Sequence, residues 1–599
     1  MKSPRFNIRA KKLEEIFSAR NIEFIWKKKV RTSMRSQIIS DGIENFDFHV
    51  YRKAESEKLS KMILSGDYSP QKCQRILLEK SKGLCRQIVI PSIRDAIVLQ
   101  CLSDALYASL KGKAPTKKSF FEPKDHSFSD TGNTYGTYRA WLNFQRALFN
   151  FSKARRYIVV TDIANYYDSI NYNYLRNSIS SISDVDECVI DMLIYVLSDL
   201  LWQPDYTPRM EVGLPQINLD APRVLAHAFL YELDSFLDSN THIDFVRYMD
   251  DVDIGVDTIV DAKMILKSVD LVLQARQVRL NSGKTLILSQ AQASQHFCIA
   301  ENAYLDNLKS RIDNKIKAGL PLDSERELVK KCIHRDLKRG SFDKGNGEKI
   351  LKRWIGLAAK VGTDIAPQAV ESVIKYRPSV RENMLTYLRG RPLTPKYAEA
   401  LYNCMSSGLL MDDAANVHIS NHLAETLCKN KRCNKFIINI IDSFDINSTY
   451  GLYCKIWMQS KYSTIDDLMK TVSDSIKVWA PDEPIGRLVG SLYPLFYGTS
   501  LIDRYKRVIA HSLNSGARDA YKFQSRLSDD VYVLNEMIPA LRSPNPTRGT
   551  GITHAKFLCL VSALNNRNAN PAHLKTLRDA NHMAFSDAYY KDIAKRTGI

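Results

Sequence analysis

The 599-residue chain lacks several features that would assign it to a common protein class. No apolar stretch approaches the roughly 20 residues of a membrane-spanning helix, so we expect no membrane partner. The first residues, Met1 to Arg5, lack the apolar core of a secretion signal, and we therefore expect a cytoplasmic protein. The 11 cysteines include no paired Cys-x-x-Cys units, which argues against a zinc site and favours reduced thiols.

The signatures of two enzyme classes are also missing. Gly283, Lys284 and Thr285 match only the end of a phosphate-binding P-loop, because Val278 stands where that motif needs a glycine. The C-terminal half carries neither a His-Asn-His cluster nor a His-x-x-Glu-His run. The sequence therefore argues against a P-loop nucleotidase and against these metal-dependent hydrolases.

Positive charge is abundant. The chain has 85 Lys and Arg against 66 Asp and Glu, a formal net charge of +19 and a pI of about 9.2. Such an excess suits a protein that neutralises phosphates. The basic runs at 26–31 and 153–157 are each as typical of a solvated face as of a binding site, so only the global charge indicates a nucleic-acid partner.

Two adjacent carboxylates occupy a predicted turn. Asp250 and Asp251 follow Tyr248 and Met249, between an apolar run and an alternating one, which predicts a β-hairpin. Acids held side by side in this way can bind the divalent metal of phosphoryl-transfer chemistry. An isolated Asp pair after a strand is more often ordinary turn chemistry, so the interpretation depends on further blocks.

A second acid lies about 90 residues upstream, where the predicted strand 157–161 ends in Asp162. Two strand-borne acidic sites at this separation resemble the paired catalytic blocks of reverse transcriptases. The resemblance implies that Asp162 binds metal and that Ile163 offers its carbonyl beside it. Tyr167 would lie under the sugar and exclude a ribose 2′-hydroxyl, so that the product is DNA. The alternative is a core tyrosine, which suits one of Tyr166 and Tyr167 better than it suits both.

Further blocks follow in the order of that family. The strand-like segment 85–91 resembles its fingers block, which implies that Arg86 holds the nucleotide phosphates with help from Lys82, itself equally typical of a solvated loop. Gln216 would contact the nucleotide near its 3′ position. Lys284 would approach the pyrophosphate, as a proton donor or as a neutralising charge. The chain departs from the family at Ile217, where a glycine is common, which puts template handling in doubt.

The resemblance implies metal-assisted nucleotidyl transfer from dNTPs. Asp162 and Asp250 would bridge two Mg²⁺ ions about 4 Å apart, with Mn²⁺ as the alternative ion. Asp251 would support them, either as a third ligand or by orienting the turn.

The implied fold is an α+β right-hand polymerase followed by an all-α domain. Fingers would span about 1–150 and the palm about 151–300, and residues 301–599 would form a thumb-like segment and a helical-repeat-like domain. Helix signals dominate from about 310 onward. Thr394 with a following proline predicts one helix that ends at Gly408, and a capping box at Thr464 and Asp467 predicts another. A plain helical bundle is the alternative.

A reverse transcriptase palm joined to a long helical half most resembles bacterial abortive-infection and defence-associated reverse transcriptases. That resemblance implies RNA-directed or untemplated DNA synthesis in antiphage defence, with a noncoding RNA as template. A protein primer, a homo-oligomer and a partner defence protein remain open. Two alternatives are a retron-like or group II intron-like enzyme of a mobile element, and a catalytically degenerate RNA-binding scaffold.

Overall fold

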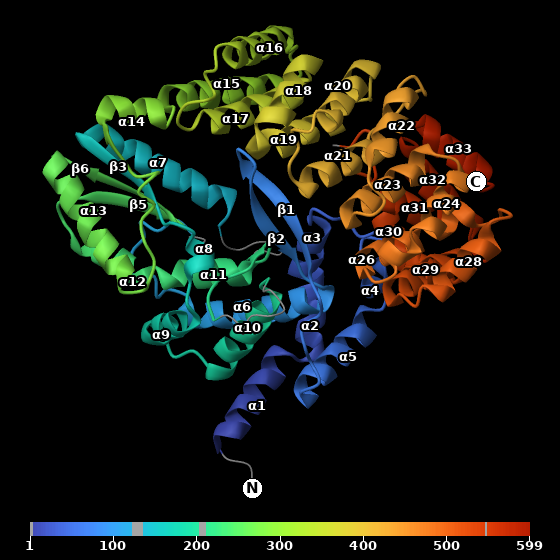
Figure 1. Cartoon of the computed structure of the whole chain (residues 1–599), viewed down its shortest axis with the longest axis horizontal. Coiled ribbons are helices and arrows are strands. Elements are labelled where there is room, and N and C mark those ends of the chain that lie inside the picture. The colour runs from blue at the N-terminus through green and yellow to red at the C-terminus, as the bar shows by residue number, and fades with distance from the viewer. Residues whose placement is uncertain (1–3, 122–135, 203–210, 546–547) are drawn as a thin grey trace. The chain divides into compact units, whose positions relative to one another are not determined.

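The computed structural model describes residues 4–121, 136–202, 211–545 and 548–599, and the chain divides into two compact units. The first unit contains residues 1–37, 52–75 and 87–301, and the second contains 38–51, 76–86 and 302–599. Helices predominate, and the described residues form two small sheets (Figure 1).

The first unit is built mainly from helices. They are α1 (Pro4–Ile16), α2 (Ala19–Ile25), the π-helix η1 (Trp26–Val30), α3 (Arg31–Arg35), α5 (Arg52–Ser65), α6 (Ile93–Leu110), α7 (Tyr138–Ala154), α8 (Tyr166–Ser169), α9 (Tyr172–Ile182), α10 (Glu187–Leu200), α11 (Asp220–Phe229), α12 (Tyr231–Ser239), α13 (Ile259–Gln274) and α14 (Gln290–His296).

A four-stranded antiparallel sheet positions the acidic residues of the first unit. Its order is β5 (Asp244–Tyr248), β6 (Asp251–Val256), β3 (Tyr157–Asp162) and β7 (Leu286–Ser289). The predicted hairpin and the predicted strand before Asp162 are confirmed. Helices α7 and α14 cover one face, where Phe144 and Leu148 pack against Ile158 and Val246. Because strand residues alternate between faces, Asp162 lies on the same face as Ile158, at the strand end.

The second sheet has the order β1 (Gln74–Ser81), β2 (Leu84–Ile90) and β4 (Gln216–Ile217). The β1–β2 turn consists of Lys82 and Gly83, whose φ angles of +53° and +79° suit the twist of a two-residue hairpin. Strand β4 runs parallel to β2, with Gln216 opposite Ile88. The predicted strand at 85–90 is therefore confirmed.

Every described element of the second unit beyond residue 301 is helical. These helices are α15 (Ile299–Lys317), α16 (Asp323–Lys338), α17 (Gly347–Val361), α18 (Pro367–Tyr376), α19 (Pro378–Arg389), α20 (Pro395–Ser406), α21 (Asp413–Glu425), α22 (Asn434–Ser443), α23 (Thr449–Tyr462), α24 (Ile465–Asp474), α25 (Ile476–Trp479), α26 (Glu483–Ser491), α27 (Tyr493–Phe496), α28 (Ile502–His511), α29 (Ser515–Asp529), α30 (Val531–Leu541), α31 (His554–Leu564), α32 (Pro571–Ala580), the 3₁₀-helix η2 (Ala584–Ser586) and α33 (Ala588–Arg596). The short α4 (Phe46–Val50) joins them.

Two of these helices begin as the sequence predicted. The Thr394 hydroxyl accepts a hydrogen bond from the Tyr397 amide at the start of α20. The Thr464 hydroxyl accepts one from the Asp467 amide at the start of α24 and donates to the Asp467 carboxylate at 2.6 Å. Both helices therefore begin at capping residues recognisable from local sequence.

From α17 to α23, each helix packs against the second helix along the chain. The contacting pairs are α17 with α19, α18 with α20, α19 with α21, α20 with α22, and α21 with α23. This alternation stacks the helices in two rows, as in an α-solenoid. This stretch agrees with the predicted helical-repeat-like arrangement, and the predicted domain at 301–599 as a whole stays a prediction.

Buried ion pairs tie short N-terminal segments into the second unit. Arg381 contacts Asp412 at 2.7 Å and Glu79 at 3.2 Å, with all three side chains buried. Arg487 contacts Asp41 at 2.6 Å and Asp47 at 2.9 Å. Residues 38–51 and 76–86 thereby form part of the helical unit although they lie hundreds of residues before it in sequence.

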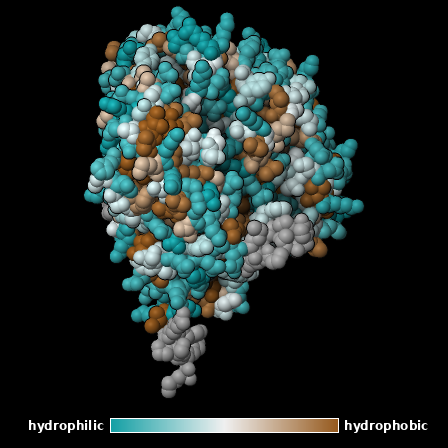
Figure 2. Space-filling model, turned by 60° about the vertical axis from the view of Figure 1, so that its left-hand side comes forward, coloured by the Kyte–Doolittle hydropathy of each residue, from teal (hydrophilic) through white to brown (hydrophobic). Residues whose placement is uncertain are grey.

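No helix in the described ranges has the length and apolarity that crossing a membrane requires. The face of the molecule in Figure 2 is largely hydrophilic, with apolar side chains in scattered groups.

Candidate active site

A row of four side chains crosses the end of the four-stranded sheet. Tyr248 of β5 lies opposite Asp251 of β6, and Asp251 lies opposite Asp162 of β3. Lys284 lies in the turn before β7, and its Nζ donates a hydrogen bond to Asp162. Directly opposed residues project from the same face with Cβ atoms about 5 Å apart. Three regions of the chain, at 162, 248–251 and 284, thus contribute side chains to this end of the sheet.

Asp162 is the best-defined member of this row. It is 8% exposed, and its Oδ2 accepts a hydrogen bond from Nζ of Lys284, whose side chain is half exposed. Its other oxygen, Oδ1, is buried and has no hydrogen-bond partner among the described residues. The Asp162 carbonyl accepts the Asn281 amide at 2.8 Å, which fixes the turn that carries Lys284. The structure thus brings Lys284 to Asp162, and its predicted contact with the leaving pyrophosphate stays a prediction.

The β5–β6 turn is held from inside the protein. Met249 has a φ of +57°, a left-handed conformation that costs a non-glycine residue about 1–2 kcal/mol. The fully buried Arg247 donates from Nη1 to the Met249 carbonyl at 2.8 Å and from Nε to Asp234 of α12 at 2.6 Å. This pair fixes the turn that presents Asp250.

Sequence reasoning missed Arg247 and Asp234. The available signal was a permanently charged residue between apolar Val246 and Tyr248 in a strand otherwise destined for the core. A buried guanidinium requires a buried carboxylate partner, but the sequence alone does not identify which acid supplies it.

The three predicted metal-binding acids lie at one end of the sheet. Asp250 is half-buried in the turn, whereas Asp251 is exposed at the first position of β6. Within the described ranges, no three His, Cys, Asp or Glu side chains form a preassembled metal cluster. Carboxylate oxygens suit Mg²⁺, which usually completes its shell with water and substrate phosphates. The unpartnered Oδ1 of Asp162, opposite Asp251, fits such a partly protein-built site.

Ile163 follows Asp162 and pairs with Leu280 through an isolated antiparallel bridge. Its side chain is buried in the core. The predicted coordination of metal by its backbone carbonyl stays a prediction.

The two tyrosines that follow Asp162 have different environments. Tyr166 is buried, and its hydroxyl donates to the Ala226 carbonyl, so it is the core tyrosine. Tyr167 is half-buried and packs edge-to-face on Tyr166 with ring centroids 5.9 Å apart. The Tyr167 carbonyl accepts the Leu214 amide at 2.8 Å. Tyr167 is therefore supported by a fixed ring and lies beside the segment that leads to Gln216.

Gln216 is half-buried in β4, and its backbone pairs with the β2 strand at Ile88. Ile217, which replaces the glycine common in the family, is buried. This position thus contributes a core side chain instead of backbone freedom.

Lys82 and Arg86 are exposed on the 76–86 segment of the second unit. Their predicted contacts with nucleotide phosphates stay predictions.

A buried carboxyl group begins α11, shortly after β4. Asp220 accepts a hydrogen bond from Nε2 of Gln100 at 3.3 Å, while its Oδ1 has no partner among the described residues. Burial raises the pKa of Asp220 to about 6, against smaller opposing effects of Arg223 and Lys29. Neighbouring Asp104, which contacts Lys29 at 2.7 Å, adds to the rise of this pKa.

The chain shows only limited similarity to known proteins. No known protein-family model matches the chain. The chain is 25% identical over 207 residues to Protein YkfC of Escherichia coli (strain K12), which covers 33% of this chain and 49% of that protein. The chain thus spans about half the length of this curated relative.

Among solved structures, the chain has some similarity to telomerases. One, from Candida tropicalis in complex with a fragment of telomeric RNA, is 14% identical with a TM-score of 0.26 and covers 69% of this chain and 68% of that one. Another, from Candida albicans in complex with the corresponding fragment, is 10% identical with a TM-score of 0.28 and covers 78% of this chain and 70% of that one. These TM-scores are too low to assign a family.

Proposed function

We propose that the chain is a reverse transcriptase, a right-hand polymerase that adds deoxynucleotides to a primer hydroxyl under RNA direction or without a template. The observation that carries the proposal is that Asp251 lies opposite Asp162 on adjoining strands, with Lys284 bonded to Asp162 and Asp250 in the neighbouring turn. The same residues occur in the order of the reverse transcriptase blocks.

Each residue of the row has a chemical task in this proposal. Asp162, Asp250 and Asp251 would hold Mg²⁺ through carboxylate oxygens, and bound Mg²⁺ activates the primer hydroxyl and neutralises phosphate charge. Lys284 would leave Asp162 and turn to the leaving pyrophosphate, where an ammonium can neutralise charge or donate a proton. Its half-exposed side chain supports that movement.

Substrate selection rests on Tyr167 and Gln216. Because Tyr166 supports the Tyr167 ring from one side, a ribose 2′-hydroxyl could not push that ring into the core. We infer deoxynucleotide substrates, and Gln216 would contact the sugar near its 3′ position. The net charge of +19 supports a nucleic-acid partner, for which we propose a noncoding RNA template and a DNA product in cytoplasmic antiphage defence.

The test is incorporation of labelled dNTPs by the purified full chain with Mg²⁺. Asp162→Asn and the double variant Asp250→Ala/Asp251→Ala are expected to lose incorporation by orders of magnitude, since they remove the metal ligands. Asp184→Asn, an exposed acid of the same unit, is the matched control and should retain it.

Removal of co-purified RNA by nuclease separates the two forms of the proposal. Loss of synthesis indicates an RNA template, and persistence indicates untemplated synthesis. A folded protein without incorporation under every condition contradicts the proposal and favours the RNA-binding scaffold.

A further inference from the structure

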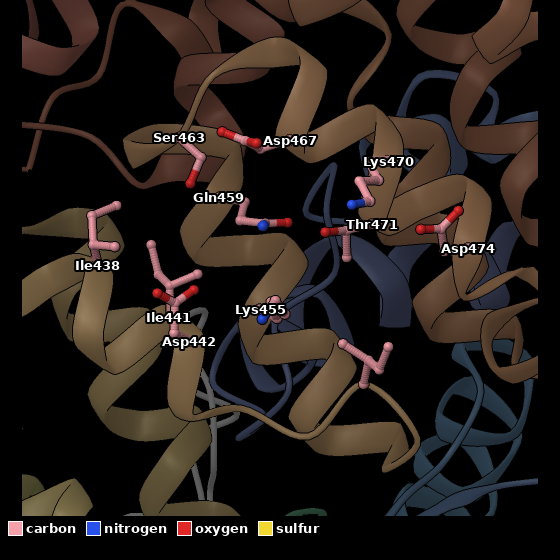
Figure 3. A pocket seen from close by; sticks show the side chains of 11 residues that line it. Ile438, Ile441, Asp442, Lys455, Gln459, Ser463, Asp467, Lys470, Thr471 and Asp474 are labelled. Carbon is pink, nitrogen blue, oxygen red and sulfur yellow. The ribbon is translucent and has the colours of Figure 1, made fainter.

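A pocket of about 400 Å³ lies in the second unit between α22, α23 and α24 (Figure 3). Its volume falls in the range of small-molecule sites. It is lined by Ile438, Ile441, Asp442, Ile446, Lys455, Gln459, Ser463, Asp467, Lys470, Thr471 and Asp474. None of these residues belongs to the first unit, which contains Asp162, Asp250, Asp251 and Lys284.

Gln459 is the strongest sign that the pocket has a ligand. It is 7% exposed, and its Oε1 is buried with no hydrogen-bond partner among the described residues. A buried polar atom left unpaired in this way costs about 1–3 kcal/mol. The carboxamide offers an acceptor beside a donor, the pair that matches the hydrogen-bonding edge of a nucleobase.

Two lysines bring positive charge to the same space. In the part of the chain that the structure describes, neither Lys455 nor Lys470 forms an ion pair. The side-chain ends of Gln459, Lys470 and Thr471 point toward one another in Figure 3. An anionic group would therefore find ammonium and hydroxyl donors next to the unpaired carboxamide.

The other residues that line the pocket favour some anionic ligands over others. Ile438 and Ile441 of α22, with Ile446 beyond the end of that helix, add apolar side chains suited to the face of a planar ring, and three aspartates can accept hydrogen bonds from amino groups and sugar hydroxyls. Inorganic phosphate would bind the lysines and the Thr471 hydroxyl but would leave the apolar side chains of the pocket without a partner. A ligand with phosphate, sugar and base satisfies every kind of group in the pocket.

We propose that this pocket binds a nucleoside phosphate, either as a free nucleotide or as the end of a nucleic-acid strand. The pocket would bind a free nucleotide or a strand end whether or not the polymerase centre is occupied.

The test is calorimetric titration of the full-length Asp162→Asn protein in EDTA with each of the four ribonucleoside monophosphates. Without divalent metal, binding at the polymerase centre is suppressed. We expect saturable binding of at least one nucleotide. Lys455→Ala/Lys470→Ala should weaken it at least about 10-fold, because charge-assisted hydrogen bonds are lost. Gln459→Leu should reduce discrimination between bases.

Lys477→Ala is the matched control, since Lys477 is exposed on α25 and does not line the pocket. Equal losses in this control would overturn the proposal, as would inorganic phosphate binding as tightly as the nucleotides. Absence of binding by both mononucleotides and a 5′-phosphorylated oligonucleotide would overturn it too. Binding of the oligonucleotide alone assigns the strand end, and binding of mononucleotides assigns the free ligand. Circular dichroism melting verifies that the variants are folded.

Discussion

Both hairpins that the structure describes have residues with left-handed φ angles in their turns, and the two turns accommodate these residues in different ways. In the β1–β2 turn, left-handed φ angles fall on exposed Lys82 and on Gly83, which adopts them without cost. In the β5–β6 turn, the left-handed residue is Met249, and the fully buried Arg247 bonds its carbonyl. In the first turn the Gly83 amide also donates to the buried Glu79 at 2.9 Å, whereas in the second the buried charge bonds the left-handed residue's own carbonyl. Both turns are therefore bonded to a buried charged side chain, and the difference is that only the first places a glycine at a left-handed position.

The largest test of this contrast is Arg247→Met. It leaves Asp234 as an unpaired charge in the core, and we expect the free energy of unfolding to fall by about 3–5 kcal/mol in urea denaturation. Adding Asp234→Leu should recover much of this loss, because no lone charge remains. Incorporation of dNTPs should stay low in the double variant, because the Met249 carbonyl still lacks the hydrogen bond from Arg247. A loss below about 1 kcal/mol for the single variant would show that the buried pair does not hold the turn.

Asp220 is another buried ionisable side chain whose surroundings affect the stability of the protein. Its folded-state pKa of about 6 lies above the ordinary 3.8, so its stabilising contribution is complete below about pH 4 and is lost as the pH rises through 6. Asp220→Asn stays neutral throughout. The unfolding free energy of the variant relative to the natural protein should rise by about 3 kcal/mol between pH 4 and 7.5. A pH-independent difference in parallel urea titrations would contradict this assignment.

On the exposed turn, Gly83→Ala should cost about 1–2 kcal/mol of unfolding free energy. No heavy atom lies within 4 Å of the added Cβ, so the cost comes from the backbone at φ +79° alone. Gly356→Ala in α17 makes the same change with equally open surroundings in a helix, where alanine should stabilise by about 0.5–1 kcal/mol. Thermal melting of both variants should give shifts of opposite sign, and shifts of the same sign would refute the backbone explanation.

The smallest effect on stability is expected for Lys82→Ala. Its side chain is exposed, so unfolding should change by less than about 0.5 kcal/mol. If Lys82 assists phosphate binding as proposed, steady-state kinetics should show a KM for dNTP raised about 5-fold at similar kcat, since one charge-assisted contact is lost. An unchanged KM would return Lys82 to the role of a solvated turn residue.

Local signals made much of the fold predictable. Alternating apolar residues identified β3 and the β5–β6 hairpin, and Thr394 and Thr464 marked the starts of two helices. The proximity of Lys284 to Asp162 was expected from the order of blocks in a resembling family. That order carries information on tertiary arrangement which periodicity alone lacks.

Long-range packing could not be predicted in the same way. Arg381 of α19 contacts Glu79, about 300 residues earlier, and so draws residues 76–86 into the helical unit. Arg247 finds its partner on a helix rather than in its own strand. Neither pairing leaves a periodic pattern, because each depends on which elements meet in space.

The row across the four-stranded sheet has a consequence for how this chain can change in length. Side chains alternate between faces, so a slip of one residue in β3 or β6 would send Asp162 or Asp251 to the opposite face. Insertions or deletions inside these strands would therefore dismantle the row even where every participating amino acid is retained. The β5–β6 turn that carries Asp250 and the turn that carries Lys284 are held by hydrogen bonds of their own, so their lengths are constrained together with the spacing within the strands.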